Sequence, residues 1–141
     1  MVHAMRYYQS QITLAAGVVF LFLGCTFTQR YQPGFNSKKA ATLDSIKGKY
    51  GFEDITFLAK KTSKSGGEST SLTIKFINGK TVPADTAAMD SLGKLLGSKV
   101  KSIVKNPKEF DTYIILFDHV VAKGAVTNED YTGHEYKSDD L

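Results

Sequence analysis

The sequence predicts a small α+β domain, and three kinds of observation support this fold class. Two segments have apolar residues at helical spacing. Two pairs of segments have the alternating or continuous apolar residues typical of strands, and turn-forming residues separate the segments from one another. The expected order is helix, strand, strand, helix, strand, strand. This order favours a mainly antiparallel four-stranded sheet with the helices packed on one of its faces.

The first predicted helix covers residues 37–50. Ser37 is a suitable N-cap, because its hydroxyl can accept a hydrogen bond from a free N–H group of the first turn. Gly51 comes directly after the helix and can end it in a left-handed conformation. The apolar positions are three or four residues apart and form one narrow stripe: Ala40, Leu43, Ile46 and Tyr50.

The second predicted helix covers residues 84–105 and is the more regular of the two. Asp85 is a suitable N-cap, and Asn106-Pro107 ends the helix because proline disfavours a helical conformation in the residue before it. At about 100° per residue the main apolar side chains fall on a single face: Met89, Leu92, Leu96, Val100 and Ile103.

The first predicted hairpin lies between these helices. Phe52–Lys61 and Thr70–Ile77 alternate apolar and polar residues, and the polar loop Thr62–Ser69 reverses the chain between them. Asn78-Gly79 is typical of a tight turn, after which Lys80–Val82 is expected to pair back briefly.

The second predicted hairpin follows the second helix. Thr112–Phe117 is apolar on both faces, which suits a central strand covered on both sides or a strand at an interface. The last strand is expected to end at about Tyr131. Residues 132–141 are polar and are expected to form a frayed C-terminal tail.

The N-terminal residues 1–24 have the marks of a secretory signal. Arg6 precedes an uncharged apolar segment, Ile12–Leu23, and the small residue Gly24 follows it. A helix of this length reaches about 18 Å, well short of the ~30 Å hydrocarbon core of a membrane. The segment is therefore expected to act as a cleaved leader rather than as a membrane span.

The sequence LFLGC at Leu21–Cys25 resembles the lipobox of bacterial lipoproteins, in which a small residue precedes a lipid-modified cysteine. The resemblance covers this segment alone. It implies a diacylglyceryl group on the Cys25 sulfur, cleavage before Cys25 and acylation of the new amine. Thr26 rather than aspartate comes next, which by analogy implies delivery to the outer membrane. The alternative is that Cys25, the only cysteine, is an ordinary small apolar residue of the leader.

This interpretation divides the chain into four parts. Residues 1–24 form the cleaved signal peptide, and 25–36 form the lipidated cysteine with a tether. Residues 37–131 form the globular domain, and 132–141 form the polar tail. The mature protein is expected to be attached to the bilayer through its acyl chains, because two or three chains bind durably where one binds marginally.

The sequence offers little catalytic or metal-binding chemistry. His119 adjoins Asp118, but neighbouring strand residues point to opposite faces, and Asp111 is the other candidate carboxylate for a small enzyme that uses His119. His134 and Glu135 are two candidate metal ligands, too few to fix a coordination geometry. We therefore expect no metal, no cofactor and no enzymatic activity. The formal net charge of +4 is too small an excess to indicate nucleic-acid binding.

One surface feature recurs along and just after the second predicted helix, a row of lysines: Lys94, Lys101, Lys105 and Lys108. Such a row is the ordinary solvated side of an amphipathic helix. The alternative is a patch that rests on anionic headgroups or on an acidic partner.

The sequence leaves three functional hypotheses. The first is a membrane-anchored envelope lipoprotein that acts as a non-enzymatic binding or assembly module for a protein partner, a small ligand or a second copy of itself. The second is an inhibitor or immunity-type lipoprotein that blocks a toxin or enzyme outside the cytoplasm. The third is a small enzyme that uses His119.

Overall fold

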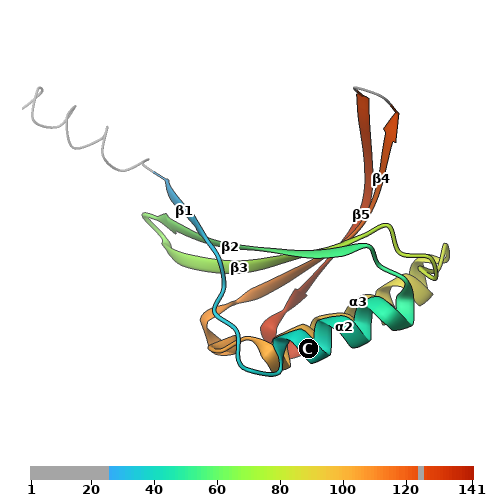
Figure 1. Ribbon diagram of the computed structural model, residues 1–141. Helices are drawn as coiled ribbons and strands as arrows, with labels where there is room; N and C mark the ends of the chain where they lie inside the picture. Colours follow the sequence, from blue (N-terminus) through green and yellow to red (C-terminus); the bar gives the residue numbers. More distant parts are fainter. Residues whose placement is uncertain (1–25, 124–125) are drawn as a thin grey trace, which may run out of the picture.

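The computed structural model describes residues 26–123 and 126–141, in which two helices and five strands follow one another (Figure 1). The helices are α2 (Lys39–Tyr50) and α3 (Thr86–Ile103). Short 3₁₀ turns at Pro107–Glu109 and Ser138–Asp140 precede and follow the last two strands. The strands are β1 (Phe27–Tyr31), β2 (Asp54–Lys64), β3 (Gly67–Ile77), β4 (Thr112–Lys123) and β5 (Val126–Lys137).

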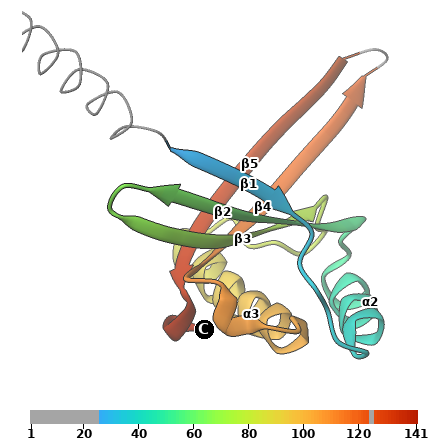
Figure 2. The ribbon, with the colours of Figure 1, turned by 90° about the vertical axis from the view of Figure 1, so that its left-hand side faces the viewer.

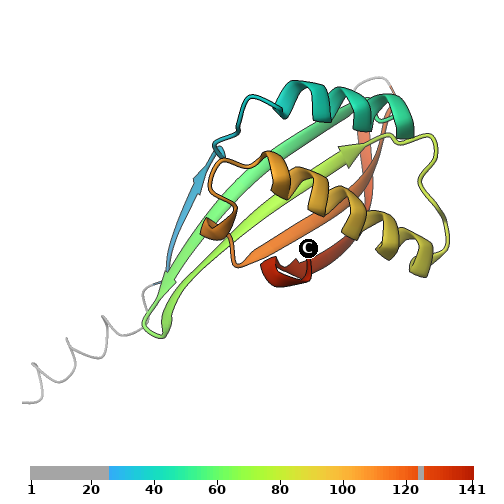
Figure 3. The same ribbon diagram turned by 90° about the horizontal axis from the view of Figure 1, so that it is seen from below.

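The strands form one mixed sheet in the order β1-β2-β3-β4-β5. The α+β class and the placement of both helices on one face are confirmed (Figures 1 and 3). The expected four-stranded, mainly antiparallel sheet is wrong in two details. The described residues contain a fifth strand, and β3 pairs with β4 in parallel while the other neighbours are antiparallel.

The fifth strand is β1, which lies within the segment expected to be a tether. Phe27 pairs with Ser63 and Tyr31 with Ala59 of β2. Tyr31 packs against the core, and its hydroxyl donates a hydrogen bond to the Glu109 carboxylate. Five residues, of which only Tyr31 packs on the core, were too short a pattern to predict a strand, but an edge strand needs pairing on one side only.

The parallel pair results from the long connection between β3 and β4. A two-residue hairpin can join only antiparallel strands, whereas a crossover of a dozen or more residues returns the chain to the same end of the sheet. Helix α3 and the turn at Pro107–Glu109 provide this crossover. The sequence predicted the helix correctly, but it did not reveal that the strands on either side of it are neighbours.

The first hairpin is longer than predicted. The β2–β3 pairing continues to Lys64 opposite Gly67, so most of the expected loop Thr62–Ser69 belongs to the sheet. Polar serine and threonine side chains here alternate across a solvated part of the sheet and therefore did not look like strand. Lys80–Val82, expected to pair briefly, forms no strand; Asn78 turns the chain with φ of 52°.

The C-terminal residues are an integral part of the fold rather than a frayed tail. Strand β5 continues to Lys137, and Tyr136 is buried with its hydroxyl 2.9 Å from Oδ1 of Asp90. Leu141 packs on the core, and its carbonyl accepts a hydrogen bond from Ser98 at 2.9 Å. The side chains of Tyr136 and Leu141 therefore hold this otherwise polar segment against the core.

The predicted helix ends were partly correct. Asp85 caps α3, since its carboxylate accepts a hydrogen bond from the Ala88 N–H at 2.9 Å, and Gly51 ends α2 with φ of 69°. Ser37 does not cap α2. Instead, the Asn36 side chain accepts a hydrogen bond from the Lys38 N–H at 3.0 Å, one residue before the helix.

The core lies between the helices and the inner face of the sheet. On the three central strands, alternate residues face inward, which leaves the remaining residues of β2, β3 and β4 on the opposite, helix-free face. The largest side chains that are fully buried come from all of these layers: Tyr113, Phe76, Phe110, Leu72, Ile74, Leu96, Ile103, Ile115 and Val100.

The close approach of α3 to β5 makes a stability prediction. A Cβ atom on Gly93 would lie 2.4 Å from the Tyr136 hydroxyl, whereas a Cβ atom on Gly48 of α2 would meet nothing within 4 Å. We expect Gly93→Ala to lower the free energy of unfolding by about 1–3 kcal/mol through overpacking. Gly48→Ala should raise it by up to about 1 kcal/mol through helix propensity. Urea denaturation of both variants measures these changes, and equal effects would contradict the packing seen here.

Candidate functional site

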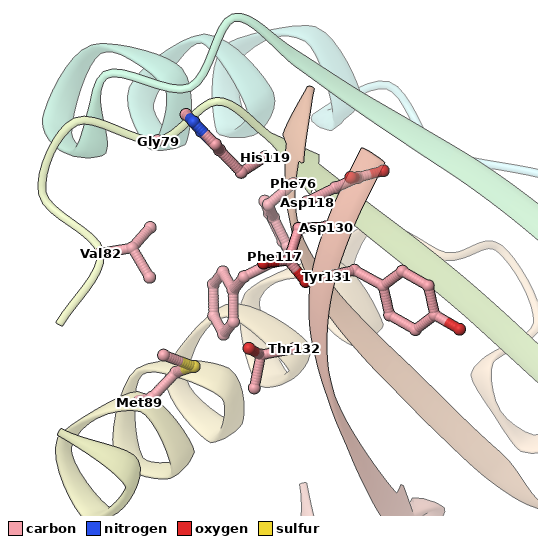
Figure 4. Close-up of a pocket in the computed structure, with 10 residues that line it drawn as sticks. All are labelled: Phe76, Gly79, Val82, Met89, Phe117, Asp118, His119, Asp130, Tyr131 and Thr132. Carbon is pink, nitrogen blue, oxygen red and sulfur yellow. The ribbon is translucent and has the colours of Figure 1, made fainter. Parts of the chain in front are cut away.

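Two concave surfaces of the described chain are candidates for a functional site. One is a cavity of about 230 Å³ near His119, between the bend of β4–β5 and the start of α3 (Figure 4). The other is the face of the sheet that carries no helix, here called the open face. In Figures 1 and 2 the β4–β5 hairpin rises away from the helices, on the side of the sheet that the helices leave uncovered.

The cavity near His119 has both apolar and polar walls. Val82, Met89 and Phe117 line one side of it, as Figure 4 shows. The imidazole of His119 points toward Gly79, while the Asp118 carboxylate lies on the other side of β4. The two side chains therefore point to opposite faces of the strand, as their adjacency in the sequence predicted.

The second candidate carboxylate for His119 is also remote. Asp111 immediately precedes β4, eight residues before His119, which corresponds to roughly 26 Å along a strand. Its carboxylate accepts a hydrogen bond from the Thr70 N–H at 2.7 Å and fixes the start of β4 against β3. The geometry does not bring His119 together with Asp111 or with Asp118.

A charged cluster on the open face joins β3, β4 and β5. The Lys75 ammonium lies 3.2 Å from Oδ2 of Asp118 and also donates a hydrogen bond to Glu129. Asp118 directly follows the apolar residues Tyr113–Phe117 of β4. Its side chain is only 2% exposed, and its Oδ1 atom has no hydrogen-bond partner among the described residues. This cluster was not predicted from the sequence. The signal that could have indicated it is an acidic residue directly after the apolar segment Thr112–Phe117.

The environment of the cluster shifts its carboxyl groups in opposite directions. Burial, and next the neighbouring Glu129, raise the pKa of Asp118 above its usual value. The hydrogen bond from Lys75 lowers the pKa of Glu129, and the same bond raises the pKa of Lys75. Asp118 therefore holds a proton more readily than Glu129, because burial and polar neighbours act differently on the two acids.

The open face has an apolar strip at its centre. We define this strip as Leu58 on β2, Ile114 and Leu116 on β4, and Tyr131 on β5; Leu58 is 38% and Tyr131 62% exposed. Ile114 and Leu116 are half-buried although no helix covers them. The apolar residues on the two faces of Thr112–Phe117 therefore have different surroundings. The inner side belongs to the core, and the outer side belongs to this strip.

The open face changes character toward the turn of the β2–β3 hairpin. Arg30 lies directly opposite Lys60 in the sheet, and Lys64 continues the same face of β2. A hollow of about 400 Å³ here is lined mainly by serine and threonine side chains, together with Lys60, Lys64 and Glu135. Like charges placed directly opposite one another repel. This end of the face therefore has an excess of positive charge that an anionic surface or ligand would relieve.

The lysine row of α3 is less uniform than the sequence indicated. Lys94, Lys105 and Lys108 are exposed. Lys101 is half-buried and donates a hydrogen bond to the Ser138 carbonyl, so that it fastens the C-terminal turn to α3. A role of this row as a contact surface stays a prediction.

His134 packs against other side chains of the fold and is not a solvated residue of a frayed tail, as had been expected. Its ring stacks on Tyr136 with an interplanar angle of 10°, and Nδ1 lies 3.5 Å from Asp90. Glu135 points to the open face, opposite Ile114, so the two residues considered as metal ligands lie on different faces. Within the described ranges, no group of three or more His, Cys, Asp or Glu side chains is arranged to hold a metal ion.

Cys25 and the leader lie outside the described residues. Among the residues that the structure does describe, no helix is long and apolar enough to span a membrane. Comparisons with protein-family models, with curated proteins and with solved structures found no match to this chain.

The buried acid makes a pH-dependent stability prediction. Because the folded-state pKa of Asp118 is raised, its contribution to stability is complete at low pH and is lost as the pH rises through that pKa. Asp118→Asn keeps the shape and can donate to Glu129 while accepting from Lys75. We expect the variant to be more stable than the wild type at neutral pH, by roughly 1–3 kcal/mol.

Urea denaturation at several pH values measures this difference. The stability advantage of D118N should shrink as the pH is lowered, since protonated Asp118 then makes the same contacts. Asp44→Asn, an identical exchange at an exposed position of α2, should change little at any pH. An advantage of D118N that is constant or grows on acidification would contradict the assignment of a raised pKa to Asp118.

Proposed function

We propose that this chain is a membrane-anchored, non-enzymatic binding module of the bacterial cell envelope. Acylated Cys25 attaches it to a membrane, and the open face of its sheet receives a protein partner. The observation that carries the binding role is the apolar strip, because half-buried apolar side chains on a helix-free sheet face mark a surface suited to a partner. The lipobox resemblance at Leu21–Cys25 supports the anchoring role.

The composition of the open face indicates what the partner presents. Leu58, Leu116 and Tyr131 require apolar contact, and a large exposed aromatic side chain is a frequent anchor in protein interfaces. Glu135 on β5 and Lys60 on β2 flank the strip and are exposed, so charged side chains of both signs on the partner would complement them. The proposed partner is therefore a protein with an apolar patch bordered by charges of both signs.

A second candidate function is inhibition of an enzyme or toxin outside the cytoplasm, and the shape of one element favours it. The β4–β5 hairpin extends well beyond the helices (Figures 1 and 2). A projecting hairpin suits insertion into a cleft, whereas an assembly module needs only the broad face. The two candidates differ in whether the partner loses its activity on binding.

The anchoring role is tested by the Cys25→Ser variant and by intact mass. Protein extracted from membranes of a host that processes lipoproteins should begin at Cys25 and carry the mass of the acyl groups. C25S should lose this modification and leave the membrane fraction, because the acyl chains provide most of the attachment. A free thiol at Cys25 with the leader still attached would show that the chain is not a lipoprotein.

The binding role is tested with a matched pair of leucines. Leu58 lies on the open face and is 38% exposed, and Leu95 lies on the outer side of α3 and is 44% exposed. Leu58→Lys should reduce the amount of cross-linked partner that co-purifies from detergent-solubilised membranes by tenfold or more. A tenfold reduction corresponds to a loss of about 1.4 kcal/mol of binding free energy. Leu95→Lys should leave the recovery of the partner unchanged.

Light scattering identifies the occupant of the open face. A monomer that binds a different protein in a manner sensitive to Leu58→Lys supports the proposal. A dimer that this substitution dissociates would make a second copy the occupant and would contradict a separate partner. Equal recovery from the wild type and from both variants would remove the open face as the binding surface.

A further inference from the structure

The start of β1 limits how far the folded domain can lie from the proposed anchor. Only Thr26 separates Cys25 from Phe27, so the Cα atoms of Cys25 and Phe27 are at most about 7 Å apart. Phe27 is itself paired with Ser63 in the sheet. This step rests on the proposed acylation of Cys25, and it leaves no free tether between the acyl chains and the domain.

The same pairing brings one particular end of the sheet to the anchor. Phe27 lies beside the turn of the β2–β3 hairpin, where Lys64 pairs with Gly67 (Figures 1 and 3). Ser63 and Lys64 are neighbours in the chain, and adjacent strands lie about 4.8 Å apart. The hairpin turn must therefore reach the membrane surface whenever Cys25 is held there.

The side chains at this end have the chemistry of a membrane contact. The ring of Phe27 is 65% exposed, the largest exposed fraction among the large apolar side chains of the described residues. An aromatic ring in this position can enter the boundary between headgroups and acyl chains. The register places Phe27 on the same side of the sheet as Tyr31, the helix side. Exposed cations lie on the open face of this end, and basic residues are attracted to an anionic leaflet: Arg30, Lys60, Lys64 and Lys137.

The acidic groups offset only part of this positive charge. Glu135 is exposed on the open face and lines the same hollow as Lys60 and Lys64. Glu68 lies near the hairpin turn but is paired with Lys61 at 2.9 Å, on the helix side of the sheet. Asp118 and Glu129 lie toward the opposite end of β3, next to Lys75. The four cations outnumber Glu135, so this part of the open face keeps a positive excess.

We infer that the end of the sheet formed by Phe27 and the β2–β3 turn is a membrane-contact surface for anionic lipid. Phe27 enters the interfacial layer, and Lys64, Lys60 and Arg30 face the headgroups. The strands then rise from the bilayer. The 11 residues of β3 span about 35 Å, so Tyr131, which lies across the sheet near Ile77, is held far from the lipid.

The absence of tryptophan from the sequence allows a direct test with the full, processed chain. Phe27→Trp and Tyr131→Trp each introduce a single fluorophore at an exposed aromatic position. Both variants are reconstituted into vesicles of equal parts brominated phosphatidylcholine and phosphatidylglycerol. The indole at position 27 should lose most of its emission to the bromine atoms and shift to shorter wavelength, and the indole at position 131 should do neither.

Two controls separate the possible failures. Flotation with the vesicles reports on the anchor alone: a chain that does not float contradicts the proposed function. A chain that floats without quenching at position 27, or with equal quenching at position 131, overturns the contact surface and leaves the anchor intact.

A matched pair of lysines identifies the charged part of the surface. Lys64→Glu should weaken the quenching at position 27, and more so in vesicles that contain phosphatidylglycerol than in pure brominated phosphatidylcholine. Lys94→Glu, on the exposed row of α3, should leave it unchanged. If Lys94→Glu has the larger effect, α3 rather than the hairpin end faces the membrane, and the inference is wrong.

Discussion

The parallel pairing of β3 with β4 is the interaction on which the rest of the structure depends. It joins the β1–β2–β3 meander to the β4–β5 hairpin, and the paired residues on its inner face are buried. Leu72 lies opposite Tyr113, Ile74 opposite Ile115, and Phe76 opposite Phe117. Helix α3 packs on β4 and β5, and α2 packs on β2 and on α3. A change of register between β3 and β4 would therefore move apolar side chains out of the core and displace the two halves of the sheet from their helices.

The pairing of β3 with β4 also determines which side chains lie on the open face. Residues between the buried positions must point away from the helices, which places Lys75 on β3 and Leu116 on β4 beside each other. The apolar strip and the charged cluster therefore lie on the same face of the sheet. One face of the same strands thus holds the molecule together while the other remains available for contact.

The sequence predicted those elements in which local signals agree. Helix α3 combines a capping aspartate, a sustained apolar stripe and a terminating proline, and each of these signals depends only on nearby residues. Strand β1 and the end of β5 were missed because their stability comes from distant partners. Tyr31 and Tyr136 each need a surface built by other parts of the chain, namely β2 and α3.

The candidate site was less predictable than the fold for the same physical reason. The Lys75–Asp118–Glu129 cluster depends on a register across three strands, and that register follows from a strand order that local patterns do not contain. Asp118 and His119 could be separated from the sequence alone, because alternation along a strand is a local property. The proximity of Phe27 to the β2–β3 turn again required knowledge of the pairing.

The antiparallel pairing of β1 with β2 has a mechanical consequence for the proposed attachment at Cys25. Under that proposal, a partner pulling on the domain would draw β1 along its own length, because the strand begins two residues after Cys25. The hydrogen bonds of an antiparallel pair run across the strands, so those of Phe27–Tyr31 would carry such a load together rather than one after another. The short edge strand would then resist shear between the proposed anchor and the folded domain.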